Sequence, residues 1–320
     1  MTRLVVIGAG GFIGKSVASE AAEHPEFELV SAARKPGSGE RAADLTAPET
    51  LRALICPGDV VVNCAGYANA NDATVDGRRL LERVNVEGVV ALAEACALKG
   101  ARQLVHLSSV AAMGPCTGEH VTEADSAPPA TAYAWSKLRA EQLLASYRDR
   151  LHVTVLRPTS VFGEGRGLAR SLCRLVSLPV VPLPAGGRSL IPFCYVKNVA
   201  AAVLLCAGNP SCFGRTFVVG DERSYTLREI VLAFARALGK RPLLLPLPAG
   251  LVGAAASLES RLADRRNRLP LLGEERIASL SRSVTYSIDE LRRATGYTPR
   301  YDLVEAADRI AAWYRREVQA

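Results

Sequence analysis

The stretch Leu4-Val5-Val6-Ile7-Gly8-Ala9-Gly10-Gly11-Phe12-Ile13-Gly14 decides the fold of this chain. Its four leading apolar residues predict a buried strand, and its glycines predict a tight turn that opens a helix near Lys15. Glycine lets main-chain N–H groups approach a pyrophosphate at the positive end of that helix. A tight turn without a ligand is the alternative, but its place between a strand and a helix favours a dinucleotide site.

Short apolar runs alternate with amphipathic segments through the first half of the chain. A parallel sheet requires such crossover helices, because parallel neighbours cannot be joined by tight turns. The sequence therefore predicts a doubly wound α/β fold. The expected strands are Leu4 to Ile7, Phe27 to Ala33, Val60 to Asn63, Gln103 to Ser108 and Val153 to Arg157.

The second half is less regular, and its glycines and prolines predict connections at 163–167 and 179–187. We expect residues 1–160, with 193–220 returning to the same sheet, to bind the dinucleotide. Residues 161–192 and 221–320 are expected to form a smaller substrate domain. The expected elements are a strand at Ile191 to Val196, a helix at Val199 to Cys206, a strand at Thr216 to Val219, and a helical tail from about Asp221 that ends in Ala306 to Tyr314.

The composition is that of a globular protein in water, with 49% hydrophobic and 22% charged residues in a chain of 320. A buried strand follows Met1 where a signal peptide would have a charged and then an apolar region. The longest uncharged stretch, Pro242 to Leu258, is shorter than the roughly 20 residues of a membrane span and is broken by prolines and glycines. We expect it to line a pocket or the core, with contact to a membrane surface as the alternative.

The eight cysteines form no Cys-x-x-Cys pair, and we expect reduced thiols in the cytoplasm. Cys116 and His120 are four residues apart, but the glycines and proline around them indicate a loop, so no metal is predicted.

The net charge of +7 is dispersed over the chain, apart from one cluster of arginines. Without interleaved aromatic residues this pattern does not predict a nucleic-acid partner. It predicts a solvated basic face, or alternatively an attraction for phosphorylated ligands. The clustered residues are Arg261, Arg265, Arg266 and Arg268.

The second strand ends in Ser31-Ala32-Ala33-Arg34-Lys35. An acidic residue at this point would hold the ribose hydroxyls of NAD, but Ala33 has no carboxylate. Arg34 can instead make a bidentate contact with a 2′-phosphate, so NADP(H) is predicted over NAD(H). The alternative is that Arg34 only lies on an exposed loop.

Two further segments indicate catalysis. Ser108-Ser109 closes the fifth strand at the carboxyl edge of the sheet, where ligands of such folds bind. Tyr133 and Lys137 stand one turn apart in a helical stretch. A phenol has an ordinary pKa of about 10, and a nearby ammonium favours its phenolate, which makes it an acid/base. Ser109 can hydrogen-bond the reacting oxygen.

Together these motifs resemble the extended short-chain dehydrogenases/reductases, the group that includes the NAD-dependent epimerase/dehydratase family. The glycine spacing Gly-x-x-Gly-x-x-Gly at Gly8, Gly11 and Gly14 fits that group, and Ser109 stands five residues before Gly114, as the family's catalytic hydroxyl does. The resemblance extends over the chain through Tyr133 with Lys137, Arg157-Pro158, Val161-Phe162-Gly163, Tyr195-Val196 and Gly296-Tyr297-x-Pro299.

The resemblance implies a role for several other residues. Asp44-Leu45 would lie beside the adenine, and Lys137 would also hydrogen-bond the nicotinamide ribose. Asn85 matches a family position, with a structural hydrogen bond as its alternative role. Helices around Leu80 to Leu98 and Ala132 to Tyr147 could form the contact of a homodimer. Further cofactor contacts are expected from Phe12, Ile13, Cys64, Ala65, Gly66 and Pro158.

Several departures from the family pattern bear on the substrate. Val110-Ala111 replaces the Asp-Glu pair of family dehydratases, which disfavours dehydration. Where nucleotide-sugar enzymes of the family have Asn, Arg and Asp, this chain has Ser160, Ile191 and Asn198, although Arg188 could substitute for the missing arginine.

The leading prediction is a ketoreductase or alcohol dehydrogenase acting on a small hydroxylated metabolite. A nucleotide-sugar epimerase or 4-ketoreductase is the first alternative. The second is a non-catalytic NADP(H)-binding sensor, which would not need Ser109, Tyr133 and Lys137 together.

Overall fold

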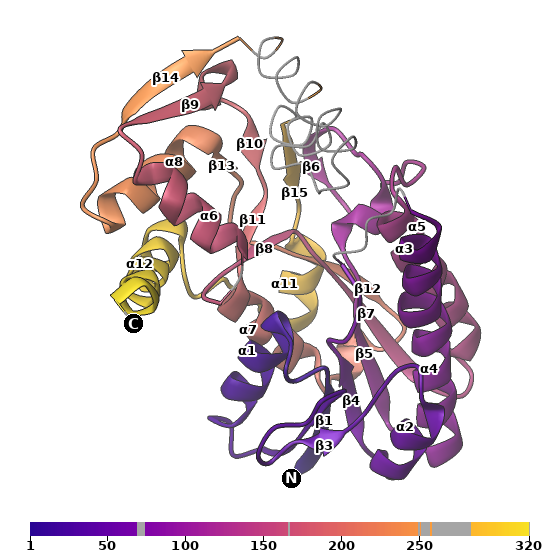
Figure 1. The fold of residues 1–320 in the computed structure, drawn as a ribbon. Coiled ribbons are helices and arrows are strands. Elements are labelled where there is room, and N and C mark those ends of the chain that lie inside the picture. The colour runs from indigo at the N-terminus through magenta and orange to yellow at the C-terminus, as the bar shows by residue number, and fades with distance from the viewer. Residues whose placement is uncertain (69–73, 166, 249, 251–256, 258–282, 320) are drawn as a thin grey trace.

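A seven-stranded parallel sheet forms the centre of the molecule (Figure 1). The structure is a computed structural model, and it describes residues 1–68, 74–165, 167–248, 250, 257 and 283–319. The strand order is β12-β7-β5-β4-β1-β2-β3, which confirms the predicted doubly wound fold. The strands are β1 (Thr2–Ile7), β2 (Phe27–Ala33), β3 (Arg41–Ala42), β4 (Val60–Asn63), β5 (Gln103–Leu107), β7 (His152–Pro158) and β12 (Thr216–Val219).

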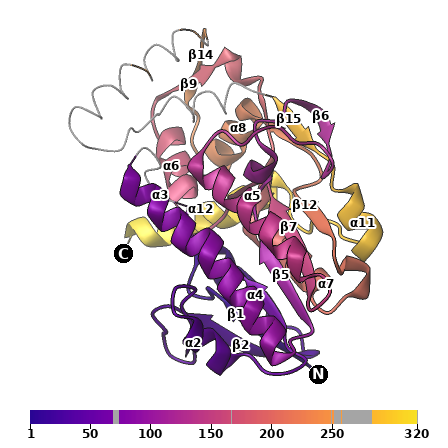
Figure 2. The ribbon, with the colours of Figure 1, turned by 90° about the vertical axis from the view of Figure 1, so that its right-hand side faces the viewer.

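Helices cover both faces of the sheet, as Figure 1 shows, and Figure 2 looks onto one of these two layers. Successive side chains of a strand point to opposite faces, so Leu4 and Val6 pack in one core and Val5 and Ile7 in the other. This burial on both faces explains why the strands read as continuous apolar runs. The first face carries α1 (Phe12–Ala21), α7 (Val196–Cys206) and α11 (Asp289–Thr295), and the second carries α2 (Pro48–Leu54), α4 (Gly88–Lys99) and α5 (Ala132–Leu144).

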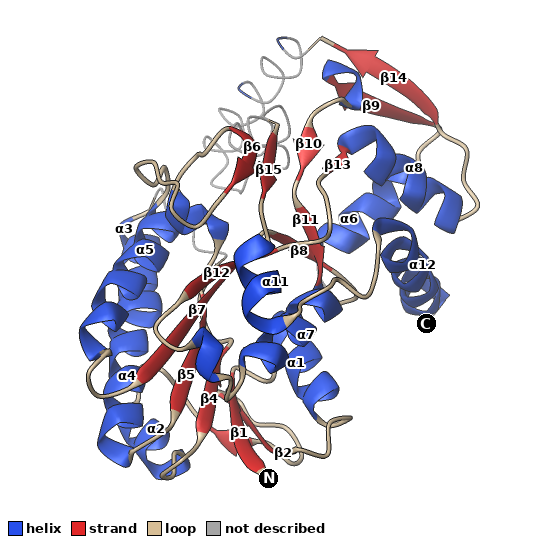
Figure 3. Cartoon of the chain, turned by 180° about the vertical axis from the view of Figure 1, so that it is seen from behind, coloured by secondary structure: helices blue, strands red, loops and turns tan. Residues whose placement is uncertain are grey.

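A third apolar core builds a second lobe beyond the carboxyl edge of the sheet (Figure 3). Its helices are α6 (Gly167–Val176), α8 (Leu227–Ala237) and α12 (Leu303–Gln319), and aromatic rings such as Phe162 and Phe234 fill the space between them. The described residues also form four two-stranded sheets outside the large sheet. They pair β8 (Ser160–Phe162) with β11 (Phe193–Tyr195), β9 (Val180–Pro184) with β14 (Leu243–Leu247), β10 (Leu190–Ile191) with β13 (Tyr225–Thr226), and β6 (Gly118–Val121) with β15 (Val284–Tyr286).

The second half departs from the sequence-based expectations in three places. The expected strand Ile191 to Val196 is divided at Pro192, and Val196 already begins α7. The expected connection 179–187 contains β9, and the described part of the tail after Asp221 contains the strands β13, β14 and β15 as well as helices. The expectation of an all-helical tail was wrong because β13, β14 and β15 each pair with a strand more than 30 residues away, which a local pattern does not reveal.

Two sequence features fall wholly or partly outside the described residues. These are the arginine cluster at 261–268 and the uncharged stretch Pro242 to Leu258, of which residues 249, 251–256 and 258 are not described. In the described part of the chain, no helix combines the length and the apolar composition needed to cross a membrane.

Candidate active site

The β1–α1 turn packs directly on the loop that follows β4. Gly8 has φ of 82°, and a Cβ there would lie 2.7 Å from the amide nitrogen of Ala65. A Cβ on Gly14 would lie 2.0 Å from the carbonyl oxygen of Gly8, so both positions require glycine. The helix begins at Phe12, and Gly11 before it provides no side-chain cap. The first N–H groups of α1 therefore point to where an anionic group of a ligand would bind.

A buried amide holds the loop after β4 in place. Asn63 Oδ1 accepts a hydrogen bond from the Ala65 nitrogen at 3.0 Å, and Asn63 Nδ2 lies 3.1 Å from His106 Nδ1. Burial, together with the charge of Lys137, holds the pKa of His106 well below its ordinary value, so this imidazole is neutral. The loop Cys64 to Gly66 is thus fixed against the strand ends.

Gly66 brings this loop close to Lys137. A Cβ on Gly66 would lie 3.5 Å from Lys137 Nζ and 3.3 Å from Asn85 Oδ1. The glycine turn, the loop after β4 and Lys137 are therefore contiguous, and glycine at positions 8 and 66 lets these segments approach one another closely. Such a close approach of backbone segments beside the start of a helix is typical of dinucleotide-binding folds.

Lys137 is buried, with 5% of its surface exposed. Its Nζ donates a hydrogen bond to the carbonyl oxygen of Leu107 at 2.8 Å. Burial lowers the pKa of this ammonium to about 8, although the nearby Glu141 and Cys64 act in the opposite direction. Burial raises the pKa of the Cys64 thiol to about 12, so the thiol is neutral. Lys137 is thus a buried cation at neutral pH.

Tyr133 lies in the first turn of α5, half-buried, and one helical turn before Lys137. The helix is capped by Thr131, whose side-chain oxygen accepts a hydrogen bond from the Ala134 nitrogen at 3.1 Å. Ser136 donates to the carbonyl oxygen of Tyr133 at 2.7 Å. One rigid element therefore carries both the phenol and the ammonium.

Asn85 joins this helix to the loop after β4. Its Nδ2 donates to Ser136 Oγ at 3.0 Å and to the Tyr67 carbonyl at 2.9 Å, while its Oδ1 accepts from the Tyr67 nitrogen at 2.7 Å. Asn85 lies in a π-helical turn (Glu82–Glu87) between α3 (Val75–Leu81) and α4. Such turns are rare and often mark functional sites.

The two serines after β5 have different surroundings. Ser108 is buried and donates a hydrogen bond to Glu141 Oε1 on α5. Ser109 is half-buried, and its Oγ accepts from the Ala111 nitrogen at 3.1 Å at the start of a short 3₁₀ turn. Among the hydrogen bonds between described residues, Ser109 Oγ acts only as an acceptor, which leaves its hydrogen for a ligand.

A buried ion pair, not anticipated from the sequence, lies behind these residues. Arg157 Nη2 donates to Glu141 Oε2 at 2.7 Å, and Arg157 Nη1 donates to the Glu123 carbonyl at 3.2 Å. Glu141 follows Lys137 by four residues, a spacing that could have identified it as a neighbour on the same helix face.

The remaining predicted cofactor residues lie at the edges of this region. Arg34 is exposed directly after β2, and Pro158 ends β7. The Asp44 carboxylate accepts from the Thr46 nitrogen at 2.8 Å, and this bond is the main reason its pKa is lowered. Leu45 instead packs against the helix at Gly88. Phe12 lies against Gly163, and Ile13 is partly buried against two of the cores.

The chain is similar to a known protein family and to several known proteins. The model of the NAD dependent epimerase/dehydratase family matches residues 4–220. The dTDP-4-dehydrorhamnose reductase of Mycobacterium tuberculosis (strain CDC 1551 / Oshkosh) is 32% identical over 216 residues, which cover 64% of this chain and 66% of that protein. Human 3 beta-hydroxysteroid dehydrogenase type 7 is 28% identical over 308 residues, which cover 84% of this chain and 80% of that protein.

Solved structures share the whole fold. RMD from Pseudomonas aeruginosa, complexed with NADPH, has a TM-score of 0.76 at 21% identity and covers 99% of this chain and 100% of that chain. The UDP-glucose 4-epimerase of Thermus thermophilus, in complex with NAD, has a TM-score of 0.73 at 24% identity and covers 98% of this chain and 99% of that chain. At these identities the likeness concerns the fold.

Proposed function

Because the chain belongs to the NAD dependent epimerase/dehydratase family, and is thus an NAD(P)-dependent enzyme of the extended short-chain dehydrogenases, we propose that it is an NADP(H)-dependent ketoreductase or alcohol dehydrogenase. Its substrate would be a small hydroxylated metabolite, and Ser109, Tyr133 and Lys137 would be its catalytic residues. The observation that carries the proposal is the buried Lys137 ammonium, which lies beside the Gly66 backbone and one helical turn after Tyr133.

The bound nicotinamide would supply or accept the hydride. Tyr133 would give a proton to the carbonyl oxygen in reduction or take one from the hydroxyl in oxidation. The positive charge of Lys137 would lower the free energy of the phenolate and so favour Tyr133 as the acid/base. Ser109 would donate a hydrogen bond to the reacting oxygen and stabilise the charge that develops on it.

Replacement of the phenol tests this mechanism. In Tyr133→Phe we expect turnover to fall by at least about a thousandfold, because the reacting oxygen loses its proton donor, while cofactor affinity changes by only a few-fold. NADPH oxidation would be followed over a panel of ketones, aldehydes and keto-sugars, with Tyr314→Phe in the second lobe as the matched control. Retained turnover would rule out Tyr133 as the acid/base.

An epimerase or 4-ketoreductase acting on a nucleotide sugar is the second candidate. Its support is the similarity to a protein named dTDP-4-dehydrorhamnose reductase. An epimerase must return its hydride to the substrate, so it tends to keep its nucleotide bound, whereas a reductase exchanges the nucleotide in each turnover. Mass spectrometry of the nucleotide released from the denatured protein separates the two, and a co-purified nucleotide sugar would favour this candidate.

The preference for NADP(H) is proposed from Arg34. Its exposed guanidinium directly follows Ala33 at the end of β2, where a 2′-phosphate would lie, and Ala33 offers no carboxylate. We expect Arg34→Asp to weaken NADPH binding by at least about tenfold and to change NADH binding much less. Titration of nucleotide fluorescence measures both affinities. An unchanged ratio of the two would show that Arg34 does not select the cofactor.

We propose that residues 1–160 with 193–220 hold the cofactor and that 161–192 with 221–320 hold the substrate. The proposed cofactor contacts are Gly8, Gly11, Phe12, Ile13, Gly14, Arg34, Asp44, Leu45, Cys64, Ala65, Gly66, Tyr133, Lys137 and Pro158. A cytoplasmic location is proposed because all eight cysteines are free thiols.

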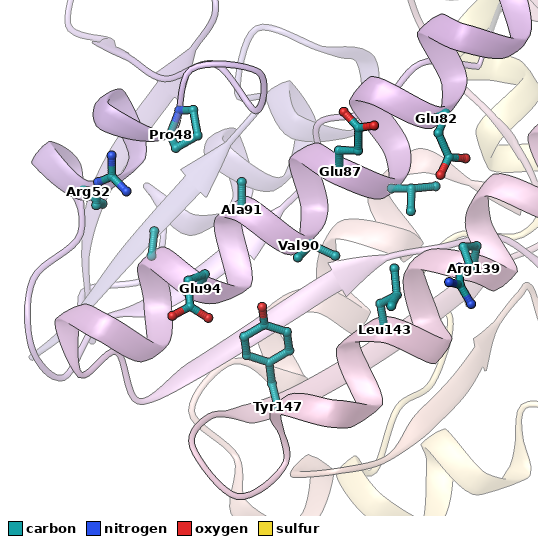
Figure 4. A pocket seen from close by; sticks show the side chains of 12 residues that line it. Pro48, Arg52, Glu82, Glu87, Val90, Ala91, Glu94, Arg139, Leu143 and Tyr147 are labelled. Atoms are coloured by element: carbon teal, nitrogen blue, oxygen red, sulfur yellow. The ribbon is translucent and has the colours of Figure 1, made fainter.

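A homodimer is proposed from a groove of about 540 Å³ on the outer side of α4 and α5 (Figure 4). Val90, Leu143 and Tyr147 form its apolar part. Its rim carries both signs of charge, with Glu82 and Glu87 on one helix and Arg139 on the other. A surface that carries both charges can complement a second copy of itself across a two-fold axis.

A further inference from the structure

The loop between β2 and β3 turns one acidic side chain toward the glycine turn. Residues 34–39 of this loop are exposed, whereas Glu40 is partly buried. Glu40 Oε2 accepts a hydrogen bond from the Gly37 nitrogen at 2.7 Å, and the Glu40 nitrogen donates to the Gly37 carbonyl at 3.2 Å. The carboxylate is thus held by the backbone of its own turn. Among the ion pairs between described residues, none neutralises it.

This carboxylate lies where the glycine turn meets the end of β2. A Cβ placed on Gly10 would lie 3.5 Å from Ala33 Cβ and 4.0 Å from Glu40 Oε1. The end of β2 and the loop that follows it therefore both meet the glycine turn at Gly10, which is itself exposed. In dinucleotide-binding α/β folds the adenosine ribose lies between the glycine turn and the second strand, and an acidic group there binds its 2′-hydroxyl.

We propose that Glu40 determines how well this chain distinguishes NAD(H) from NADP(H). Ala33 provides no carboxylate at the end of the strand. The Glu40 carboxylate, which comes from the loop, provides one instead and accepts a hydrogen bond from the ribose 2′-hydroxyl of NAD(H). The same charge repels the 2′-phosphate that Arg34 attracts. The chain therefore binds both nucleotides, and the preference that Arg34 alone would give is reduced. This inference rests on the proposed function only in requiring a dinucleotide at the Gly8–Gly14 turn.

The alternative role of Glu40 is to stabilise the turn at Gly37. The variant Glu40→Gln separates the two roles, because the Gln side-chain oxygen can still accept the hydrogen bond from the Gly37 nitrogen while the negative charge is removed. A change in nucleotide selectivity then reports the charge and not the shape of the loop.

The experiment measures the dissociation constants of NADPH and NADH for the full-length protein by nucleotide fluorescence. In Glu40→Gln we expect NADPH to bind about tenfold more tightly, because one repulsive charge is gone, and NADH to bind several-fold more weakly, because a charge-assisted hydrogen bond is lost. Glu49→Gln is the matched control, since Glu49 is exposed in the first turn of α2, and it should leave both affinities unchanged.

A second pair of probes removes the nicotinamide end from the comparison. Adenosine 2′,5′-bisphosphate and 5′-AMP differ only in the 2′-phosphate, and Glu40→Gln should favour the first over the second by a similar factor. If wild-type protein binds both dinucleotides and Glu40→Gln leaves their ratio unchanged, the role given to Glu40 is overturned while the proposed function stands. If wild-type protein binds neither dinucleotide, the proposed function fails and the role of Glu40 fails with it.

Discussion

Burial of the Lys137 ammonium is unfavourable for folding. Burial lowers its pKa from the ordinary 10.5 to about 8, so between these values the unfolded chain binds more protons than the folded one. Stability contributed by this group therefore rises as the pH rises from about 8 to 10.5. Below pH 8 the folded state bears the whole cost, about 3 kcal/mol. The proposed site thus keeps a destabilising charge, which the proposed mechanism uses.

The variant Lys137→Met tests this cost. At pH 7 we expect the free energy of unfolding to increase by about 2 kcal/mol, somewhat less than the full cost because the hydrogen bond to the Leu107 carbonyl is lost. The gain should largely disappear near pH 10, and turnover should be lost at every pH. Urea unfolding at both pH values provides the measurement.

Lys240→Met is the control, since Lys240 is exposed. It should leave stability nearly unchanged at both pH values. A Lys137→Met protein less stable than wild type at pH 7 would contradict the assignment of a buried, costly charge.

At the scale of the elements, one ion pair links the segments that carry the site. Glu141 on α5 accepts hydrogen bonds from Arg157 on β7 and from Ser108 at the end of β5. The neighbours of these residues are the proposed site residues Lys137, Pro158 and Ser109. Exposed fractions of 13% for the Arg157 side chain and 8% for that of Glu141 mean that water cannot replace a lost partner.

We expect Glu141→Gln to lower the free energy of unfolding by about 3 kcal/mol, because the buried Arg157 charge is left uncompensated. Turnover should also fall, because the end of β5 that bears Ser109 is no longer held against α5. Glu317→Gln is the matched control: Glu317 also accepts a hydrogen bond from an arginine, at 2.9 Å, but both partners are exposed, so the loss should stay below about 1 kcal/mol. Equal losses in the two variants would argue against a special role for Glu141.

The elements differ in how far the sequence predicts them. Six of the seven strands of the large sheet were predicted closely, with Phe27–Ala33 and Val60–Asn63 matching at both ends, because each is a largely apolar run between helices. The seventh, β3, was not predicted, because it has only two residues and both are exposed. The short strand Leu243–Leu247 was not, because it exists only through pairing with Val180–Pro184, far earlier in the chain.

The same distinction applies to the candidate site. Tyr133 and Lys137 were selected from their spacing within one helix, and the structure has them on one helix. The positions of Glu40 and Glu141 depend on a folded-back loop and on a contact between a helix and two strand ends. Neither contact could be read from local sequence.

At the scale of the whole molecule, the groove over α4 and α5 bears on assembly. If a second copy covers it, a charge placed in its apolar part should separate the copies. We expect Leu143→Glu to convert a dimer to a monomer, as measured by size-exclusion chromatography with light scattering. Leu232→Glu on the exposed side of α8 is the control and should leave the mass unchanged. A wild-type monomer at micromolar concentration would overturn the homodimer.

The third core contains residues from early and late parts of the chain, and this has a consequence for biosynthesis. The large sheet receives its last strand at Val219, whereas the core of the second lobe joins residues around Phe162 to helix α12, which begins at Leu303. During translation the sheet can assemble while the lobe still lacks helix α12. Until that helix leaves the ribosome, the apolar faces of α6 and α8 remain unsatisfied, and a nascent chain at this stage is a natural client for chaperones.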